Sequence, residues 1–355
     1  MKVLIIGSGG REHALAWKLA QSSGAEVVFT SVAAAAGGNV KLNLFDMSAP
    51  DKALAFCKDN AVGLVVIGPE APLEQGLADA LRKGGLKVFG PGRAGAKLEW
   101  SKDYSKAFMQ KFNIPTAAYK SFTEAAAALE YIKTIDMPAV VKADGLAAGK
   151  GVIICQTKEE AASAVLDLMQ KQAFGAAGAK VVIEEFLEGR EASIMAFVDG
   201  DNYKLLPISR DHKRLLDGDK GPNTGGMGVY SPVPDIEELD LEFIAANIFD
   251  NVIVGLKAEK IDFCGLLYAG IMKGPRGINV LEFNTRFGDP ETQTILPLIE
   301  QDLLDVMLAC ADKRLNDIDV TARAQSGVCV TLAGGDYPKT SSKGVQILGL
   351  ENVKD

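Results

Sequence analysis

Short apolar runs alternate with amphipathic stretches over the first hundred residues of the chain. The runs predicted to be strands cover 3–6, 27–30, 64–67 and 87–89, and the stretches predicted to be helices cover 12–21, 51–58 and 73–83. A strand that is apolar at every position is buried on both faces, which is typical of a parallel sheet covered by helices. The pattern predicts an α/β fold whose N-terminal domain is a doubly wound parallel sheet.

From residue 191 onward the pattern changes to strands joined by turns. The helices predicted beyond residue 100 are 101–111, 125–134, 158–170, 239–258 and 303–311, and the strands are 139–142, 151–155, 180–184, 265–272, 278–284 and 328–332. The residues from Ser121 to Glu124 are expected to open the second of these helices, with Thr123 as its N-cap. The motif Gly90-Pro91-Gly92 interrupts the pattern, and a Gly/Asp-rich stretch at 217–228 predicts a long loop.

Composition narrows the class of protein. The chain has 355 residues, a net charge of −8 and no block of Lys and Arg, which argues against a nucleic-acid partner. No apolar segment reaches a membrane-spanning length, and two histidines are too few for a multi-histidine zinc site. The five cysteines are scattered without a C-x-x-C pair, so we expect buried thiols in a reducing compartment, the cytoplasm. The length predicts two or three domains.

The first candidate site is a glycine-rich turn between the first strand and the first helix. It reads GSGGREH at 7–13. Small residues here let backbone N–H groups at the helix N-terminus approach a phosphate. A dinucleotide-binding turn requires G-x-G-x-x-G, and Glu12 stands where the third glycine belongs. We therefore expect an anion site for a substrate phosphate, and the alternative is a tight turn without a ligand.

A second glycine-rich loop, KADGLAAGKG at 142–151, lies between two predicted strands. It differs from a Walker A loop because Gly145 and Gly149 are one residue too close and Gly151 replaces the Ser or Thr. With Lys142 and Lys150 at its two ends, it is expected to be a hairpin that folds over phosphates. A plain hairpin with surface lysines is the alternative.

Polar residues alternate with apolar ones at the end of the strand predicted at 278–284. Glu282, Asn284 and Arg286 are expected to point one way, while Leu281 and Phe283 point into the core. A carboxylate beside an amide oxygen suits Mg²⁺, which accepts few protein ligands. The alternative is an amphipathic strand with a polar outer face, and the spacing alone does not decide between the two.

Two further segments are weaker signals. The strand that ends at Glu184 and Glu185, followed by Glu191, can offer backbone groups and a carboxylate to a nucleoside. The charged cluster DHKR at 211–214, followed by the glycine-rich loop at 221–228, is expected to be a mobile substrate lid. Solvated glutamates and an ordinary exposed loop are the alternatives.

Together, eight segments resemble those of the phosphoribosylamine–glycine ligases, which are ATP-grasp enzymes. They are GSGGREHA (7–14), VIGPEAPL (66–73), VFGP (88–91), KADGLAAGKGV (142–152), VIEEFLEG (182–189), DHKR (211–214), GPNTGGMGVYSP (221–232) and LEFNTRFGDPETQ (281–293). The similarity runs from residue 1 to about 340 in the family's order and spacing.

The resemblance implies an N-terminal doubly wound domain at 1–100 on the phosphoribosylamine side. A two-lobed ATP-grasp domain would follow at 101–320, with its small lobe at about 120–188, and a partial C-terminal domain at 321–355.

The resemblance also implies a reaction of purine biosynthesis. ATP would phosphorylate the carboxylate of glycine, and the amine of 5-phosphoribosylamine would attack the acyl phosphate to give glycinamide ribonucleotide, ADP and phosphate. The cofactors would be ATP and Mg²⁺ or Mn²⁺. The protein would be a cytoplasmic monomer with no membrane or nucleic-acid partner. The amine would arrive by diffusion or by transient handover from the enzyme that makes it.

Residue roles follow from the same resemblance. ATP would be bound by Lys102, Lys142, Asp144, Gly145, Gly149, Gly151, Glu184, Phe186, Leu187 and Glu191. Glu282 and Asn284 would hold the metal. Asp211 and Arg286 would hold the ammonium and the carboxylate of glycine, and with Lys150 they would form the catalytic group. Substrate would also be bound by Gly9, Gly10, Arg11, Glu12, His13, Pro69, Glu70, Asp289 and Pro290.

The chain departs from the family pattern in two places. The P-G-N-A-G-like turn after the second strand is replaced by the Ala-rich stretch at 31–39. The chain also stops at Asp355, where the family's C-terminal domain continues. We therefore expect the strand at 328–332 to lack sheet partners and to expose apolar surface, with the residues after about 320 poorly ordered, exchanged between molecules or truncated.

Three competing functions remain open from the sequence. Another ATP-grasp ligase would share the loop at Lys142 and the Glu282/Asn284 pair, and would differ at Asp211, Arg286 and the N-terminal pocket. A nicotinamide-dependent oxidoreductase would need a ribose-binding acid at the end of the second strand, which instead ends in Thr-Ser. A catalytically inactive nucleotide-binding homologue would bind ATP without turnover.

Overall fold

The structure of the protein is a computed structural model that describes residues 1–29, 49–146, 151–169, 179–218, 220–340 and 345–352. Three sequence predictions lie outside these residues. They concern Gly149, Lys150 and the Ala-rich turn at 31–39.

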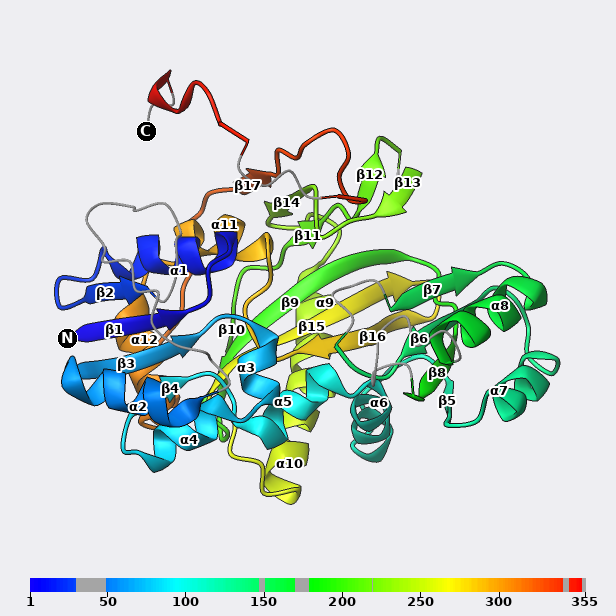
Figure 1. The fold of residues 1–355 in the computed structure, drawn as a ribbon, viewed down its shortest axis with the longest axis horizontal. Coiled ribbons are helices and arrows are strands. Elements are labelled where there is room, and N and C mark those ends of the chain that lie inside the picture. Colours follow the sequence, from blue (N-terminus) through cyan, green and yellow to red (C-terminus); the bar gives the residue numbers. More distant parts are fainter. Residues whose placement is uncertain (30–48, 147–150, 170–178, 219, 341–344, 353–355) are drawn as a thin grey trace.

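The N-terminal domain is the predicted doubly wound parallel sheet. Its strand order is β2-β1-β3-β4, and every neighbouring pair is parallel. Figure 1 shows α1 on one face of this sheet and α2 and α4 on the other. The elements are β1 (Lys2–Ile6), α1 (Gly10–Leu19), β2 (Glu26–Phe29), α2 (Pro50–Asp59), β3 (Val62–Ile67), α3 (Glu70–Glu74), α4 (Leu77–Lys83) and β4 (Lys87–Phe89).

Two helical predictions in this region were wrong in detail. The single helix expected at 73–83 is two helices, because Gly76 adopts a left-handed conformation with φ +81° between α3 and α4. Helix α5 (Arg93–Trp100) was missed because it begins directly after the Gly-Pro-Gly motif. Ser101 then has extended backbone, and its hydroxyl accepts a hydrogen bond from Tyr104 N, so it caps the predicted helix α6 (Lys102–Lys111).

A small lobe follows, with its own antiparallel sheet in the order β5-β8-β6-β7. Its elements are β5 (Tyr119–Phe122), α7 (Ala125–Ile132), β6 (Ala139–Ala143), β7 (Val152–Cys155), α8 (Lys158–Met169) and β8 (Val181–Glu185). Strand β5 occupies residues expected to open a helix, and the helix cap is Glu124 instead of Thr123. The reason is tertiary, because Phe122 is buried in the lobe's core and its ring lies 5.2 Å from that of Tyr131.

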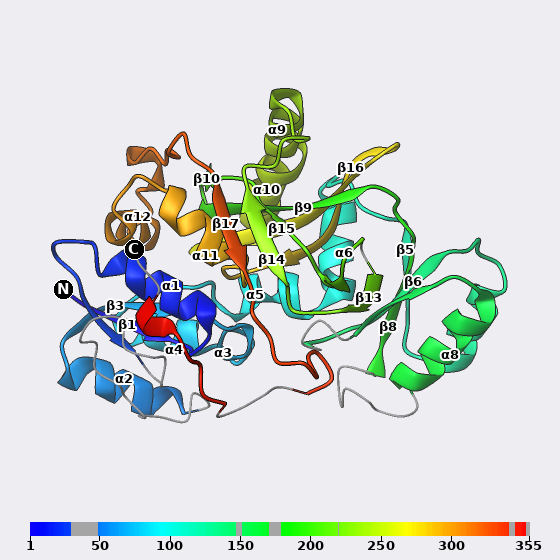
Figure 2. The same cartoon turned by 90° about the horizontal axis from the view of Figure 1, so that it is seen from above.

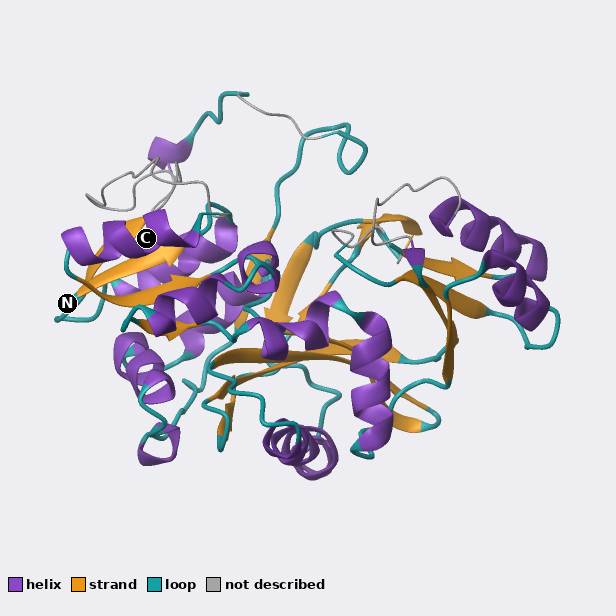
Figure 3. Ribbon diagram, turned by 60° about the horizontal axis from the view of Figure 1, so that its bottom comes forward, coloured by secondary structure: helices purple, strands orange, loops and turns teal. Residues whose placement is uncertain are grey.

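The large lobe contains a second antiparallel sheet, ordered β10-β9-β15-β16. A helical segment, seen nearly end-on, lies below this sheet in Figure 3. It was predicted at 239–258 and forms as α9, a π-helical turn η2 and α10. The elements are β9 (Arg190–Val198), β10 (Tyr203–Leu205), α9 (Glu238–Ile244), η2 (Ala245–Phe249), α10 (Asp250–Ala258), β15 (Gly265–Gly274), β16 (Gly277–Asn284), α11 (Glu291–Ile295), η3 (Leu296–Leu298), α12 (Leu303–Ala311) and η4 (Leu315–Asp317).

The strand expected to lack a partner is paired. Strand β17 (Gly327–Val330) runs antiparallel to β14 (Gly228–Ser231), which pairs in turn with β11 (Arg210–Asp211), and Figure 2 shows β17 beside β14. This pairing within one chain contradicts the prediction of an unpaired strand. The predicted exposure of apolar surface is confirmed, since Val328 and Leu332 are 72% and 94% exposed.

Two shorter features complete the described chain. The stretch predicted as a long loop at 217–228 contains β13 (Lys220–Asn223), which pairs antiparallel with β12 (Arg214–Leu216) just before it, and the start of β14. A helical turn η5 lies at Leu350–Asn352. None of the helices in the described residues is long and apolar enough to cross a membrane.

Candidate active site

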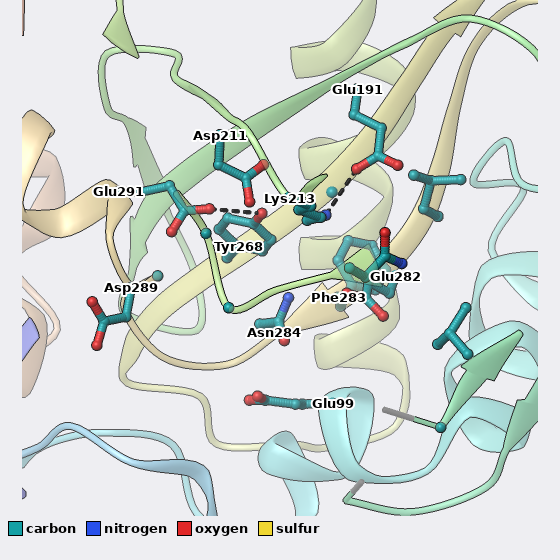
Figure 4. A pocket seen from close by; sticks show the side chains of 18 of the residues that line it. Glu99, Glu191, Asp211, Lys213, Tyr268, Glu282, Phe283, Asn284, Asp289 and Glu291 are labelled. Atoms are coloured by element: carbon teal, nitrogen blue, oxygen red, sulfur yellow. Dashed lines mark hydrogen bonds and ion pairs between the residues drawn. The ribbon is translucent and has the colours of Figure 1, made fainter. Parts of the chain in front are cut away.

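A cavity of about 1020 Å³ lies between the N-terminal domain and the two lobes. It is lined by many residues that the sequence singled out, and Figure 4 shows part of its wall. These residues are Gly10, Arg11, Glu70, Lys102, Lys142, Gly145, Gly151, Glu184, Phe186, Leu187, Glu191, Asp211, Glu282, Asn284, Arg286, Asp289 and Pro290. The cavity therefore joins groups that the sequence assigned to nucleotide, metal and substrate.

One region of the cavity carries the predicted phosphate-binding lysines. Lys102 Nζ donates to the carbonyl of Gly145 at 3.2 Å, which places it at the start of the glycine-rich loop. Lys142 Nζ donates to the carbonyl of Leu281 at 3.2 Å and pairs with Glu184 Oε1 at 2.9 Å. Two ammonium groups from different elements thus face the same cavity, as binding of a polyphosphate requires.

Sequence reasoning missed the lysine that lies behind this pair. Lys106 Nζ is 2.8 Å from Glu184 Oε2 and 2.8 Å from Thr116 Oγ1. Burial lowers the pKa of Lys106 to about 8, although the Glu184 carboxylate acts to raise it. The available signal was the spacing of Lys102 and Lys106, which puts both on one face of α6.

A β-bulge in β16 turns the polar side chains toward the cavity. Gly270 of β15 pairs with Glu282, whereas the next residue, Ile271, pairs with Val280, so Leu281 is the extra residue. Val280 and Phe283 are both buried in the core, and Leu281 lines the cavity. The prediction that Leu281 points into the core was wrong, because strict alternation fails at the bulge.

Facing this strand is a polar wall of the large lobe. Lys213 Nζ pairs with Glu191 Oε2 at 2.8 Å, and Glu291 Oε1 accepts from Tyr268 OH at 3.2 Å (Figure 4). Burial raises the pKa of Asp211 to about 6, and the charges of Glu291 and Glu191 add to this effect against the opposing charge of Lys213. Burial disfavours the ammonium form of Lys213, yet Asp211 and Glu191 raise its pKa well above the usual value.

Arg286 lies at the junction of this wall with the N-terminal domain. Its Nη2 is 3.0 Å from Glu99 Oε1 and 3.3 Å from Asn284 Oδ1, and its Nε is 3.6 Å from Glu70 Oε2. The guanidinium therefore enters the cavity between carboxylates of the N-terminal part of the chain.

Two family models match the chain. The phosphoribosylglycinamide synthetase N domain matches residues 1–99, and the phosphoribosylglycinamide synthetase ATP-grasp (A) domain matches residues 100–292. The chain belongs to the phosphoribosylglycinamide synthetase family.

Relatives in this family are similar along nearly the whole chain. The phosphoribosylamine–glycine ligase of Neisseria meningitidis serogroup A is 48% identical over 353 residues, which are 99% of this chain and 84% of that protein. That of Clostridium acetobutylicum is 44% identical over 358 residues, 100% of this chain and 86% of that protein. The crystal structure of phosphoribosylamine–glycine ligase from Thermotoga maritima matches with a TM-score of 0.84 and 37% identity, covering 96% of this chain and 83% of that one. These matches confirm the predicted family and fold.

Glu282 and Asn284, the two residues expected to hold a divalent cation, both line the cavity. Burial opposes ionisation of Glu282, but Lys142, Lys213 and Lys102 outweigh it and lower its pKa. Among the described residues, no three His, Cys, Asp or Glu side chains group closely enough to hold a metal by themselves. A carboxylate beside an amide oxygen is a donor set that suits Mg²⁺, which takes its remaining ligands from phosphates and water.

Of the predicted site residues that the structure describes, five do not line the cavity: Gly9, Glu12, His13, Pro69 and Asp144. Glu12 is buried, and its carboxylate accepts from Gly9 N at 2.7 Å and Arg11 Nε at 2.6 Å. The Asp144 carboxylate accepts from Ser101 Oγ and Asp103 N at the start of α6. Their contacts in this structure support the loops around the site, and their roles toward ligands stay predictions.

Several residues that were not assigned to the site from the sequence also line the cavity. They are Glu99, Lys106, Lys213, Tyr268 and Glu291. Lys213 and Glu291 lie within segments that resembled the family, so the motifs held the signal. Glu99 lies in helix α5, which the sequence did not predict, and Tyr268 lies within the apolar strand β15.

Proposed function

We propose that this chain ligates glycine to 5-phosphoribosylamine with consumption of ATP. The products are glycinamide ribonucleotide, ADP and phosphate. The observation that carries the proposal is the single cavity that joins the lysines of the phosphate region, the Asp211 wall and the N-terminal loop at Gly10 and Arg11. The Neisseria and Clostridium relatives, named phosphoribosylamine–glycine ligase, support it.

ATP occupies the side of the cavity between the two lobes. Apolar side chains, among them Val140, Leu187 and Met272, line this region and provide faces for the purine. Lys102 and Lys142 bind the phosphates, and Glu191 accepts from the ribose hydroxyls once its pair with Lys213 opens. A cation held by Glu282 and Asn284 supplies charge neutralisation on the phosphates when bound.

Glycine binds between the polar wall and the end of β16. Its ammonium pairs with the carboxylate of Asp211, and its carboxylate pairs with the guanidinium of Arg286. A carboxylate oxygen of glycine attacks the terminal phosphorus of ATP, the bond to ADP breaks, and glycyl phosphate forms. Lys213 stabilises the negative charge that spreads over the transferred phosphoryl group.

Phosphoribosylamine binds on the N-terminal side. Its phosphate approaches the backbone at Gly10 and the guanidinium of Arg11, and Glu70 lies beside its sugar. The neutral amine attacks the carbonyl carbon of glycyl phosphate, loses a proton, and expels inorganic phosphate. The acyl phosphate makes this attack possible because a free carboxylate is a poor electrophile.

The experiment that tests the proposal is glycine-dependent release of ADP from ATP and Mg²⁺, with and without freshly generated phosphoribosylamine. Release that requires both substrates supports the proposal. Activity with another amino acid instead of glycine would show a different ATP-grasp ligase. Binding of ATP without turnover of any amino acid would show an inactive nucleotide-binding homologue.

A further inference from the structure

Glu99 is a buried carboxylate near the end of α5, and both of its oxygens are engaged. Oε2 accepts from Thr285 N at 2.8 Å and from Thr285 Oγ1 at 3.1 Å. Oε1 pairs with Arg286 Nη2 at 3.0 Å. The side chain is 7% exposed, so water competes little for these contacts.

The segment that Glu99 holds directly follows β16, the strand that carries Glu282 and Asn284. Thr285 and Arg286 come immediately after Asn284, and Thr285 is buried. Glu99 therefore fixes both the backbone at the end of β16 and the guanidinium that lies beside Asn284.

Helix α5 is a rigid support for this carboxylate. It lies against β16, and it approaches the large lobe so closely that a Cβ atom on Gly95 would come within 2.8 Å of the Phe263 ring. The position of Glu99 is consequently set by packing that is independent of any ligand.

Glu70, the other carboxylate near Arg286, is placed differently. It is 3.6 Å from Nε and 34% exposed, and it makes no contact with the Thr285 backbone. Glu70 can move with a substrate, whereas Glu99 holds two adjacent residues at once.

We propose that Glu99 is a positioning residue that orients Arg286 for the carboxylate of glycine. This inference rests on the proposed function. A planar guanidinium binds a carboxylate through two parallel hydrogen bonds, so its affinity depends on orientation. Glu99 sets that orientation from one side, and Nη1 of Arg286 donates to the carbonyl of Phe287 at 3.1 Å. The Nε–H, which has no hydrogen-bond partner among the described residues, and the second N–H of Nη1 remain for the substrate.

The test is the substitution Glu99→Gln, which keeps an oxygen for Thr285 N–H and removes the charge that attracts Arg286. The KM for glycine should rise about tenfold or more, because a binding group displaced by a fraction of an ångström loses its geometry. The Kd for ATP without glycine, measured by calorimetry, should stay within about twofold. Glu99→Ala should enlarge the glycine effect in the same direction.

A double-mutant cycle shows whether Glu99 acts through Arg286. In an Arg286→Lys background, Glu99→Gln should change the KM for glycine by less than about threefold, because the group it orients is already altered. If the increase in the KM for glycine in the double variant equalled the product of the increases in the two single variants, the proposal would be overturned. Equal losses of ATP affinity, glycine affinity and thermal midpoint in Glu99→Gln would also overturn it, since they indicate a merely structural role.

Glu259→Gln is the matched control. Glu259 accepts hydrogen bonds from Tyr104 OH and Lys111 Nζ and lies outside the cavity lining. Its substitution should leave the KM for glycine unchanged. An inactive wild-type protein would refute the proposed function, whereas an active wild type with normal glycine kinetics in both Glu99 variants would refute the role of Glu99 alone.

Discussion

Two lysines in the cavity form ion pairs with glutamates, and charged groups of a substrate can replace one partner of such a pair. Lys213 pairs with Glu191, and Lys142 pairs with Glu184, while Asp211 has no ion-pair partner within bonding distance among the described residues. A carboxylate without a directly bonded cation is suited to receive the ammonium of an amino acid. Burial raises the pKa of Asp211, and the charges of Glu291 and Glu191 add to this effect although the charge of Lys213 opposes it.

The raised pKa of Asp211 predicts the acid limb of the pH profile. The carboxylate form binds an ammonium, and protonation removes this form as the pH falls below about 6. We expect kcat/KM for glycine to fall about tenfold per pH unit below that value, measured by ADP release. Asp211→Asn should give a low rate without this limb. His212→Asn is the control. If the acid limb disappeared in that variant, His212 and not Asp211 would be its cause.

The lowered pKa of Lys106 predicts a stability effect at high pH. Between about 8 in the folded protein and the ordinary value of 10.5, the unfolded chain binds more protons at this site than the folded one. Its contribution to the free energy of unfolding therefore increases as the pH rises through this window, by up to ~3 kcal/mol. Below about pH 8 this contribution no longer depends on pH, because Lys106 is protonated in both the folded and the unfolded chain.

Lys106→Met provides the measurement. The free energy of unfolding of the wild type minus that of the variant should become more positive between pH 8 and pH 10, in chemical denaturation. The exposed Lys133, changed to Met, serves as the control. A difference that is flat or decreases with pH would show that Lys106 is not a destabilised ammonium.

At the scale of elements, the side chain of Glu12 lies against the glycines that follow the carboxyl ends of β1 and β3. Glu12 lies over Gly7 and Gly68, and a Cβ atom added to Gly68 would come within 2.0 Å of Glu12 Oε1. The glycines at these two strand ends thus admit the carboxylate that ties Gly9 N and Arg11 together. This explains why an acid stands where a dinucleotide-binding turn has its third glycine.

Gly68→Ala is predicted to disturb the N-terminal loop selectively. The new methyl group must displace Glu12, whose oxygens both hold hydrogen bonds, so we expect a loss of about 1–3 kcal/mol in stability. The KM for phosphoribosylamine should rise, while ATP affinity is retained because the lobes are untouched. Gly24→Ala, where a methyl group meets no atom within 4 Å, is the matched control. Unchanged kinetics in Gly68→Ala would argue against Glu12 as the support of this loop.

At the scale of the molecule, the N-terminal domain and the large lobe share one hydrophobic core. Leu15 and Leu19 of α1 pack in the same cluster as Phe197 of β9 and Met307 of α12. The small lobe has a separate core between its sheet and α7 and α8. The cavity therefore lies between one large body and one independent lobe.

This division predicts two unfolding transitions in calorimetry. Met307→Ala removes a fully buried side chain and should destabilise the larger body by about 2–5 kcal/mol. The midpoint temperature of the small lobe should not change in this variant, and ATP should raise that midpoint because it binds the folded lobe. Ala128→Gly in the core of the small lobe is the reciprocal variant. A single transition shifted equally by both substitutions would contradict the division.

Local pattern was enough to predict most strands and helices of this protein. Short apolar runs such as Leu64 to Ile67, rich in β-branched residues, favour buried strands, and their alternation with helices predicts a parallel sheet. The motifs at 7–14, 142–152 and 281–293 likewise identify the family, and most of the residues they named do line one cavity. These features depend on neighbours in sequence, whose periodicity can be read directly.

Only the tertiary structure decided how the residues in those motifs are supported. The bulge at Leu281 depends on pairing with β15, and strand β5 forms because Phe122 has a core to enter. Glu99 lies in a helix that the sequence did not predict, and Lys106 looks like a surface residue of its helix. Their roles depend on contacts with the end of β16 and with β8, far along the chain. Contacts between distant segments are set by packing and by the need to pair buried charges, and no local period records them.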